Sequence, residues 1–252
     1  MDLRNLIKPH FLSRLKILFL KHEYLSRLFR LRYFSLNGLD QKIESFVDYD
    51  KGFYVELGAN DGVNQSNTLY FEHFRDWKGI LIEPGHKNFT ELTRNRSPRN
   101  SFRNVACVGP TYEQPTVDLI YSNLMTSTLG IDTDLSDPLD HARKGESLGG
   151  GTPYIFQSTA ITLNTVLIEA DAPSLIDLLS LDVEGVELEV LMGVDHSRFR
   201  FNYICVESRQ FDRINYFLQE HGYSFVKSLS FHDYLFKDVK QSKNTSSRPL
   251  SK

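Results

Sequence analysis

The chain has 252 residues, of which 40% are hydrophobic and 24% are charged. This length allows one sizeable core, or one domain with appendages, and the composition is that of a globular protein rather than a disordered one. Residues 1–35 contain eight Lys or Arg and two acids, whereas the remainder contains 21 basic and 30 acidic residues. An acidic main body argues against a nucleic-acid-binding domain.

The cysteines and the apolar runs bear on the compartment. Cys107 and Cys205 are the only cysteines, and both stand in apolar stretches, which favours buried free thiols and a reducing environment. The longest apolar run near the N-terminus is Ile17 to Leu20, far short of the ~20 residues of a membrane span and too short for a signal peptide. We therefore expect a cytoplasmic protein.

Residues 1–37 form a predicted basic, amphipathic helical arm. Apolar side chains recur at roughly helical spacing there, with lysines and arginines between them. Such a helix is attracted to anionic membrane surfaces or docks on a partner. It also fits a helix that packs across its own domain with a solvated basic face, and the sequence leaves both interpretations open.

Residues 38–238 alternate between strand and helix patterns. The first part predicts strands over 52–57, 79–84 and 101–109, with helices over 66–74 and 87–96. Ser66 or Asn67 is a suitable cap for the first of these helices. Short apolar strands that alternate with helices are typical of a mainly parallel sheet covered on both faces.

The second part begins with a more polar stretch. Residues 110–153 predict one strand over 116–122 within a long loop, which we expect to cap the binding site for a substrate. Then follow a strand over 155–163, a helix and a strand within 174–185, a helix over 186–194, a strand over 201–208 and a helix over 211–222. Residues 223–238 predict two strands with a reversal near Ser228 to Ser230, and the polar tail 239–252 is predicted to be disordered.

The end of the first strand carries a glycine-containing loop. Glu56, Gly58, Ala59, Asn60, Asp61 and Gly62 lie there in the stretch VELGANDG. In open α/β sheets, ligands bind beyond the carboxyl ends of the strands, and glycine lets the backbone come close to them. Asn60 stands where a dinucleotide fingerprint has its second glycine, which counts against NAD and FAD.

The next two strand ends add polar residues at the same depth. Glu83 and Pro84 follow the second strand, where a carboxylate can accept hydrogen bonds from ribose hydroxyls. Asn104 and Ala106 follow the third, where they could meet an adenine. Together these residues suit a ligand that has a ribose and an adenine but no pyrophosphate, such as S-adenosylmethionine.

Carboxylates follow the two later strands. Asp182 and Glu184 stand at one strand end and Glu207 at the other, where a carboxylate could orient the methyl donor or remove a proton from a hydroxyl. His141 and His232 are weaker candidates for this base. No metal-ligand spacing of Cys and His occurs, so we predict no metal site, although a divalent ion between Asp182 and Glu207 stays an alternative.

Three motifs together resemble the FkbM family of S-adenosylmethionine-dependent methyltransferases. They are VELGANDG, GILIEP and DVEGVELEVLMG. The segment SNTLYFE is similar to the branch of the family that includes Star-like proteins. The resemblance covers about residues 50–235. It implies an α/β fold of the class I, Rossmann-like type: a mainly parallel, seven-stranded sheet with an antiparallel last strand and helices on both faces. Asn164 stands where we expect the family to carry an acid more often.

The resemblance also implies a function. It implies methyl transfer to a hydroxyl group, with a sugar of a glycan, glycolipid or natural product as acceptor. The acidic body and the lack of an Asn/Asp-Pro-Pro-Tyr-like motif argue against a nucleic acid partner. The residues 56–62 would form the cofactor loop, Glu83 would hold the ribose, and Asp182 and Glu184 would lie at the active-site mouth. In the cap, Tyr121, Met125, His141, Arg143 and Lys144 could contact the acceptor. A methyltransferase fold kept as a non-catalytic binding or trafficking module is the alternative.

Overall fold

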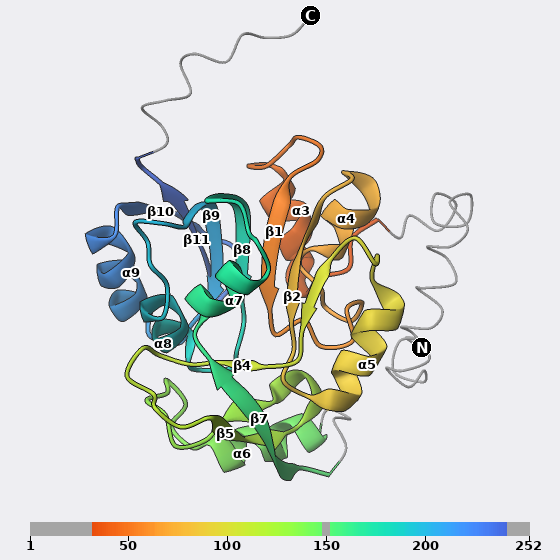
Figure 1. Cartoon of the computed structure of the whole chain (residues 1–252), viewed down its shortest axis with the longest axis vertical. Coiled ribbons are helices and arrows are strands. Elements are labelled where there is room, and N and C mark those ends of the chain that lie inside the picture. The colour runs from red at the N-terminus through yellow and green to blue at the C-terminus, as the bar shows by residue number, and fades with distance from the viewer. Residues whose placement is uncertain (1–31, 148–151, 241–252) are drawn as a thin grey trace, which may run out of the picture.

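A seven-stranded sheet forms the centre of the protein. The computed structural model describes residues 32–147 and 152–240, shown in Figure 1. The strand order is β10-β11-β9-β8-β1-β2-β3, and the neighbours are parallel except that β11 is antiparallel to both β9 and β10. This arrangement confirms the predicted class I fold. The strands are β1 (Phe53–Leu57), β2 (Lys78–Ile82), β3 (Ser101–Arg103), β8 (Leu175–Leu181), β9 (Arg200–Glu207), β10 (Tyr223–Ser228) and β11 (Asp233–Asp238).

Helices cover both faces of this sheet. One face packs against α7 (Leu163–Glu169), α8 (Glu187–Met192) and α9 (Phe211–Glu220). The other packs against α3 (Leu39–Glu44), α4 (Leu69–Phe74) and α5 (His86–Asn95). The central strands are apolar on both sides because both sides are buried, as expected for parallel strands with crossover helices.

A second, smaller sheet contains the two strands predicted over 116–122 and 155–163 together with two short ones. Its order is β4-β7-β5-β6, and it lies below the main sheet in Figure 1 together with α6 (Pro138–Gly145). The predicted strand over 101–109 is divided between the two sheets, since β3 belongs to the main sheet and β4 to the second. The strands are β4 (Ala106–Cys107), β5 (Thr116–Tyr121), β6 (Ser127–Thr128) and β7 (Tyr154–Ile161).

One predicted helix is wrong. Residues 174–185 were expected to begin with a helix, but β8 runs through Leu175–Leu181 without one. Its dense apolar run is compatible with either element, and burial on both faces selects the strand. The helix lies earlier, at α7, where the Thr162 side chain accepts a hydrogen bond from the Thr165 amide and caps the first turn.

The ends of the chain are only partly described. The predicted basic arm and the predicted disordered tail lie outside the described residues, apart from residues 32–37 and 239–240. The first described elements are a short 3-10 helix, η2 (Leu36–Gly38), and α3. Cys107 and Cys205 are free and buried. Within residues 32–147 and 152–240, no helix has the length and apolarity needed to cross a membrane.

Arg96, just after α5, occupies a buried polar cluster. Its side chain is 0% exposed, and its guanidinium lies 3.2 Å from Glu56 of β1 and 2.9 Å from Glu72 of α4. It also donates to the hydroxyls of Tyr54 and Thr68. Because one guanidinium offsets two carboxylates, the cluster fixes β1, α4 and the end of α5 relative to one another.

Replacing Arg96 tests how strongly this cluster stabilises the fold. Arg96→Met would leave Glu56 and Glu72 buried without a compensating charge, so we expect a loss of about 3–5 kcal/mol in the free energy of unfolding. Urea unfolding followed by circular dichroism measures it. Arg99→Met is the matched control, because Arg99 and Asp76 form an ion pair whose side chains are 50% and 55% exposed, and it should cost less than about 1 kcal/mol. Equal losses in the two variants would contradict this account.

Candidate functional site

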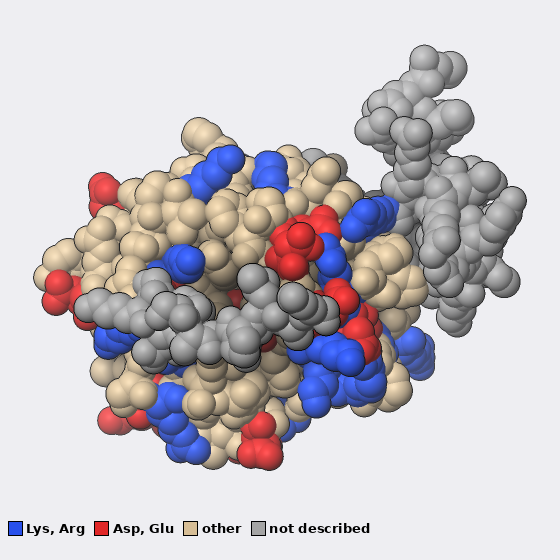
Figure 2. Space-filling view, turned by 90° about the horizontal axis from the view of Figure 1, so that it is seen from above, with Lys and Arg blue, Asp and Glu red and all other residues tan. Residues whose placement is uncertain are grey.

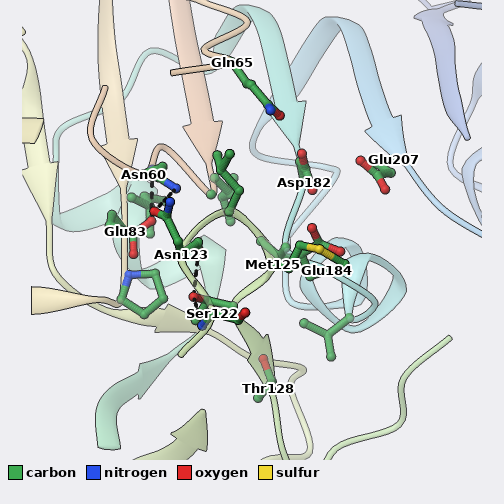
Figure 3. A pocket seen from close by; sticks show the side chains of 18 of the residues that line it. Asn60, Gln65, Glu83, Ser122, Asn123, Met125, Thr128, Asp182, Glu184 and Glu207 are labelled. Carbon is green, nitrogen blue, oxygen red and sulfur yellow. Dashed lines mark hydrogen bonds between the residues drawn. The ribbon is translucent and has the colours of Figure 1, made fainter. Parts of the chain in front are cut away.

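A cavity of about 690 Å³ lies between the carboxyl ends of the main-sheet strands and the second sheet. Its walls come from the ends of β1, β2, β8 and β9, from the segment 64–67, and from residues 122–126. The last of these belong to the part of the chain that forms the second sheet and α6, which we call the second unit. Figure 3 shows Asn60 and Glu83 on one side and Asp182 and Glu207 on the other. The volume falls within the range of about 300–1,000 Å³ that is usual for ligand pockets.

Gly58 is required by a close backbone approach at the end of β1. Its φ is +75°, and a β-carbon added there would lie 1.9 Å from the carbonyl oxygen of Asp182. Only glycine satisfies both conditions. The loop then turns across β2, where the Ala59 amide donates to the Ile82 carbonyl and the Asn60 amide donates to Glu83.

Glu83 is a buried carboxylate at the end of β2. It is 5% exposed and accepts hydrogen bonds from the amides of Asn60 at 3.0 Å and Gly85 at 2.7 Å. Burial nevertheless raises the pKa of Glu83 to about 7. Each carboxylate oxygen has lone pairs beyond those used by the amides, so Glu83 can still accept hydroxyl donors from the cavity that it lines.

Five of the predicted cofactor residues line the cavity and five do not. The lining ones are Gly58, Asn60, Glu83, Pro84 and Ala106. Each of the other five residues has a structural role next to the cavity. Asp61 accepts from the amides of Val63 and Asn64, and Asn104 donates to the carbonyls of Glu83 and Pro84. Glu56 accepts from Ser66, Asn67 and Thr68 and pairs with Arg96, while Ala59 and Gly62 shape the loop by a hydrogen bond between their backbones.

Asp182, Glu207 and Asp233 form a row of carboxylates on one face of the main sheet. Leu181 is paired with Val206, which places Asp182 beside Glu207, and Glu207 is itself paired with Asp233. All three line the cavity. Burial, together with the neighbouring carboxylates, raises the pKa of Asp182 well above its usual range and that of Glu207 to about 7. Burial also raises the pKa of Asp233.

Glu184 joins the second unit to the main sheet. Its carboxylate lies 2.8 Å from Nε2 of His141 in α6 and 3.2 Å from the guanidinium of Arg209, which follows β9. Arg209 also pairs with Asp134, whose carboxylate accepts from the Arg209 amide. Glu184 has a φ of +56° and is followed by Gly185, so the backbone turns sharply here to direct the carboxylate towards α6.

Several lining residues escaped the sequence analysis. Arg209, Asp233 and Asn67 are the most informative, because each carries a polar group on the cavity wall. Asp233 could have been found from its position at the start of the last strand, opposite Glu207. Of the expected cap contacts, Met125 and His141 line the cavity, whereas Tyr121, Arg143 and Lys144 do not. His232 also lies outside the lining.

Within the described part of the chain, no group of three or more His, Cys, Asp or Glu side chains is arranged to hold a metal ion. The carboxylate row has the charge but not the convergent geometry of such a site. An ion shared by Asp182 and Glu207 therefore has no support from a third ligand among these residues.

Three solved structures are similar to the chain, all at low sequence identity. A putative RNA methyltransferase from Pyrococcus horikoshii is 11% identical, covers 81% of each chain and has a TM-score of 0.41. A precorrin-6y C5,15-methyltransferase from Geobacter metallireducens is 12% identical, covers 75% of this chain and 80% of its own, and has a TM-score of 0.38. A fibrillarin/Nop5p complex matches at 13% identity, coverage of 74% and 71%, and a TM-score of 0.36.

No curated protein matches the chain significantly. The family model of the methyltransferase FkbM domain matches residues 56–225, which is more than half of the chain and contains the glycine loop, Glu83, Asp182, Glu184 and Glu207. With the sheet order and the cavity at the strand ends, the chain belongs to the FkbM family of methyltransferases, whose methyl donor is S-adenosylmethionine.

Proposed function

We propose that this methyltransferase transfers the methyl group to a hydroxyl of a sugar in a glycan, glycolipid or natural product. The observation that carries the proposal is the carboxylate row across the cavity from Glu83, with Glu207 at a pKa of about 7. A hydroxyl acceptor benefits from a base of this kind, and a pKa near the working pH is the one at which a base is most effective.

The residues on the Glu83 side fit the donor. Glu83 would accept the ribose hydroxyls, and Pro84 and Ala106 offer small apolar surfaces to the adenine. Gly58 leaves room for close approach. Asn67 lines the cavity, is 8% exposed, and its Oδ1 has no hydrogen-bond partner among the described residues, so it is available to the donor or the acceptor. When bound, S-adenosylmethionine supplies an activated methyl group on a sulfonium.

Glu207 is our choice of general base. The Asp182 carboxyl forms no hydrogen bond or ion pair with a described residue, and burial and the neighbouring carboxylates raise its pKa well above its usual range. Glu207 lies 3.6 Å from the Arg209 guanidinium, which favours its charged form. Glu207 would take the hydroxyl proton as the oxygen–carbon bond forms and the sulfur–carbon bond breaks, leaving an ether and S-adenosylhomocysteine.

The second unit would bind the acceptor. Residues from Ser122 to Thr126 and His141 close the cavity opposite the strand ends, and Asn60 donates to Asn123 at 3.3 Å across the two units. Amides and carboxylates are suited to sugar hydroxyls because they offer both donors and acceptors. Basic and acidic side chains are interspersed on the face shown in Figure 2, which supports the proposal that this face does not bind nucleic acid.

Glu83→Gln should weaken donor binding about tenfold or more, because hydrogen bonds to a charged acceptor are among the stronger ones. Calorimetric titration with S-adenosylmethionine measures the affinity. The exposed Glu113→Gln is the matched control and should bind like the parent. Unchanged affinity in Glu83→Gln would refute the ribose assignment.

Donor binding should also release a proton below pH 7. The pKa of Glu83 is about 7 in the donor-free protein, so part of the population is protonated there, while ribose hydroxyls stabilise the charged form. Affinity should therefore fall as the pH drops from 8 to 6. Calorimetry at pH 6.5 in two buffers of different ionisation enthalpy detects the proton, and Glu83→Gln should abolish the difference between buffers.

Glu207→Gln should lower kcat by roughly 10²–10⁴-fold at saturating donor while donor affinity stays close to that of the parent. In the parent, the rate should fall as the pH drops below about 7, because Glu207 is then protonated. The variant should lose this pH dependence. A variant that keeps both the rate and the pH profile would exclude Glu207 as the base.

A screen of sugars with labelled methyl donor separates the enzyme from the non-catalytic alternative. Transfer of label to a sugar hydroxyl, located by mass spectrometry after cleavage, supports the proposal. Donor binding without transfer to any member of the screen would favour a binding module.

A further inference from the structure

The cavity is lined by more acidic side chains than basic ones. Among the described residues that line it, five carry carboxylates, and Arg209 is the one with a permanent positive charge. His141 is the other basic lining residue, and its Nε2 faces Glu184. Buried carboxylates of this number are costly unless cations or hydrogen-bond donors meet them.

Two of the five carboxylates each have a pair of hydrogen-bond donors or cations as partners. Glu83 is held by two backbone amides and faces the donor, and Glu184 lies between Arg209 and His141. Asp182, Glu207 and Asp233 remain. Arg209 is 3.6 Å from Glu207. The Ser230 hydroxyl donates to Asp233, and His232 and Lys42 favour its charged form, although Lys42 donates its own hydrogen bond to the Leu229 carbonyl. The donor carries a sulfonium, an α-ammonium and a carboxylate, so its net charge of +1 can offset only one of the three.

Asn67, which lies next to the carboxylate row, provides an independent observation. Asn67 donates through Nδ2 to Ser180, which lies on the same face of β8 as Asp182 and two residues before it. Its Oδ1 is buried without a partner among the described residues. Asp182 likewise has no hydrogen-bond partner there. The groups without hydrogen-bond partners here, Asn67 Oδ1 and the Asp182 carboxylate, are both acceptors. A ligand with several hydrogen-bond donors would satisfy them.

We propose that the acceptor carries a protonated amine next to the hydroxyl that is methylated, as in an amino sugar or an aminocyclitol. This inference rests on the proposed hydroxyl methylation. The ammonium would lie against Asp182 and Asp233, with three N–H donors for their carboxylates and Asn67 Oδ1, while Glu207 takes the hydroxyl proton. A hydroxyl in its place would supply one donor and no charge.

The same arrangement explains why oxygen rather than nitrogen receives the methyl group. An ammonium held by carboxylates keeps its proton and has no lone pair with which to attack the donor. The neighbouring hydroxyl becomes the nucleophile when Glu207 removes its proton, so the product is a methyl ether that still carries the amine.

The test compares acceptors that carry this positive charge with neutral counterparts of two kinds, an acetamide and a hydroxyl. Glucosamine and 2-deoxystreptamine are each paired with their N-acetylated forms, and glucose and myo-inositol serve as neutral polyols. Transfer from labelled donor gives kcat/KM, and calorimetry on the protein with S-adenosylhomocysteine gives acceptor affinity. We expect the amines to exceed their neutral counterparts roughly tenfold or more in both measurements, as for a desolvated charge pair.

Neutral sugars that bind and react as well as the amines would overturn this inference and leave the hydroxyl methylation intact. Donor binding with neither amine binding nor amine transfer would overturn the inference as well. Methyl groups found on nitrogen would overturn both the inference and the proposed function, so the two failures are distinguishable.

A charge-neutralising variant locates the effect. Asp233→Asn keeps the shape and an acceptor for the Ser230 hydroxyl but removes one charge from the row. It should reduce the preference for amines about fivefold or more without changing donor affinity. Asp118→Asn is the matched control, because Asp118 is exposed on β5 and accepts from the Gln157 side chain outside the cavity lining. An amine preference unchanged by Asp233→Asn would remove Asp233 from the site, and the comparison of acceptors on the parent protein needs no variant.

Discussion

The buried guanidinium of Arg96 holds together the segments from which one wall of the active site is built. It contacts Tyr54 and Glu56 on β1, Thr68 and Glu72 at α4, and the carbonyl of Gly62 and the hydroxyl of Ser66 in the loop between them. Ala59 and Val63 hold the first part of this loop in the apolar core, whereas the polar residues that follow them are held by hydrogen bonds. Because Arg96 fixes this part of the loop, residues 64–67 can present side chains to the cavity in one arrangement.

The two reactants would depend on different parts of the molecule. The donor side is formed by the ends of β1 and β2, where backbone amides hold Glu83 and a close contact with Asp182 admits only Gly58. The acceptor side is shared by β8, β9 and β11 with the second sheet. Contacts that cross the two units, such as Asn60 with Asn123 and Glu184 with His141, fix the two sides of the cavity relative to one another, and in the proposed function they would set the distance between donor and acceptor. Such fixed separation is what methyl transfer needs most.

The sequence predicted the main sheet well because its strands are short apolar runs that end in Gly, Glu or Asp. The loop VELGANDG, Glu83, Asp182 and Glu207 could be found for the same reason, since side chains just past parallel strands meet at one edge. Of the second sheet, β5 and β7 were predicted at 116–122 and 155–163, whereas β6 was missed and β4 was merged with β3, because β4 and β6 have two residues each. Glu56 was given a place beside the donor because no local pattern shows that Arg96, 40 residues later, pairs with it. Arg209 and Asp233 become visible only when strands distant in sequence are aligned.

The second unit leaves and rejoins the main fold at neighbouring points. It begins at β4 and ends at β7, and these strands are paired side by side, with Ala106 opposite Ala160 and Cys107 opposite Ile161. An inserted segment whose ends lie together can be lengthened, shortened or exchanged without disturbing the register of the surrounding strands. The chain is therefore organised as a main sheet with an inserted second sheet that faces the carboxyl ends of its strands. A change of length within this insert would alter the cavity wall that it forms and leave the register of the main sheet intact.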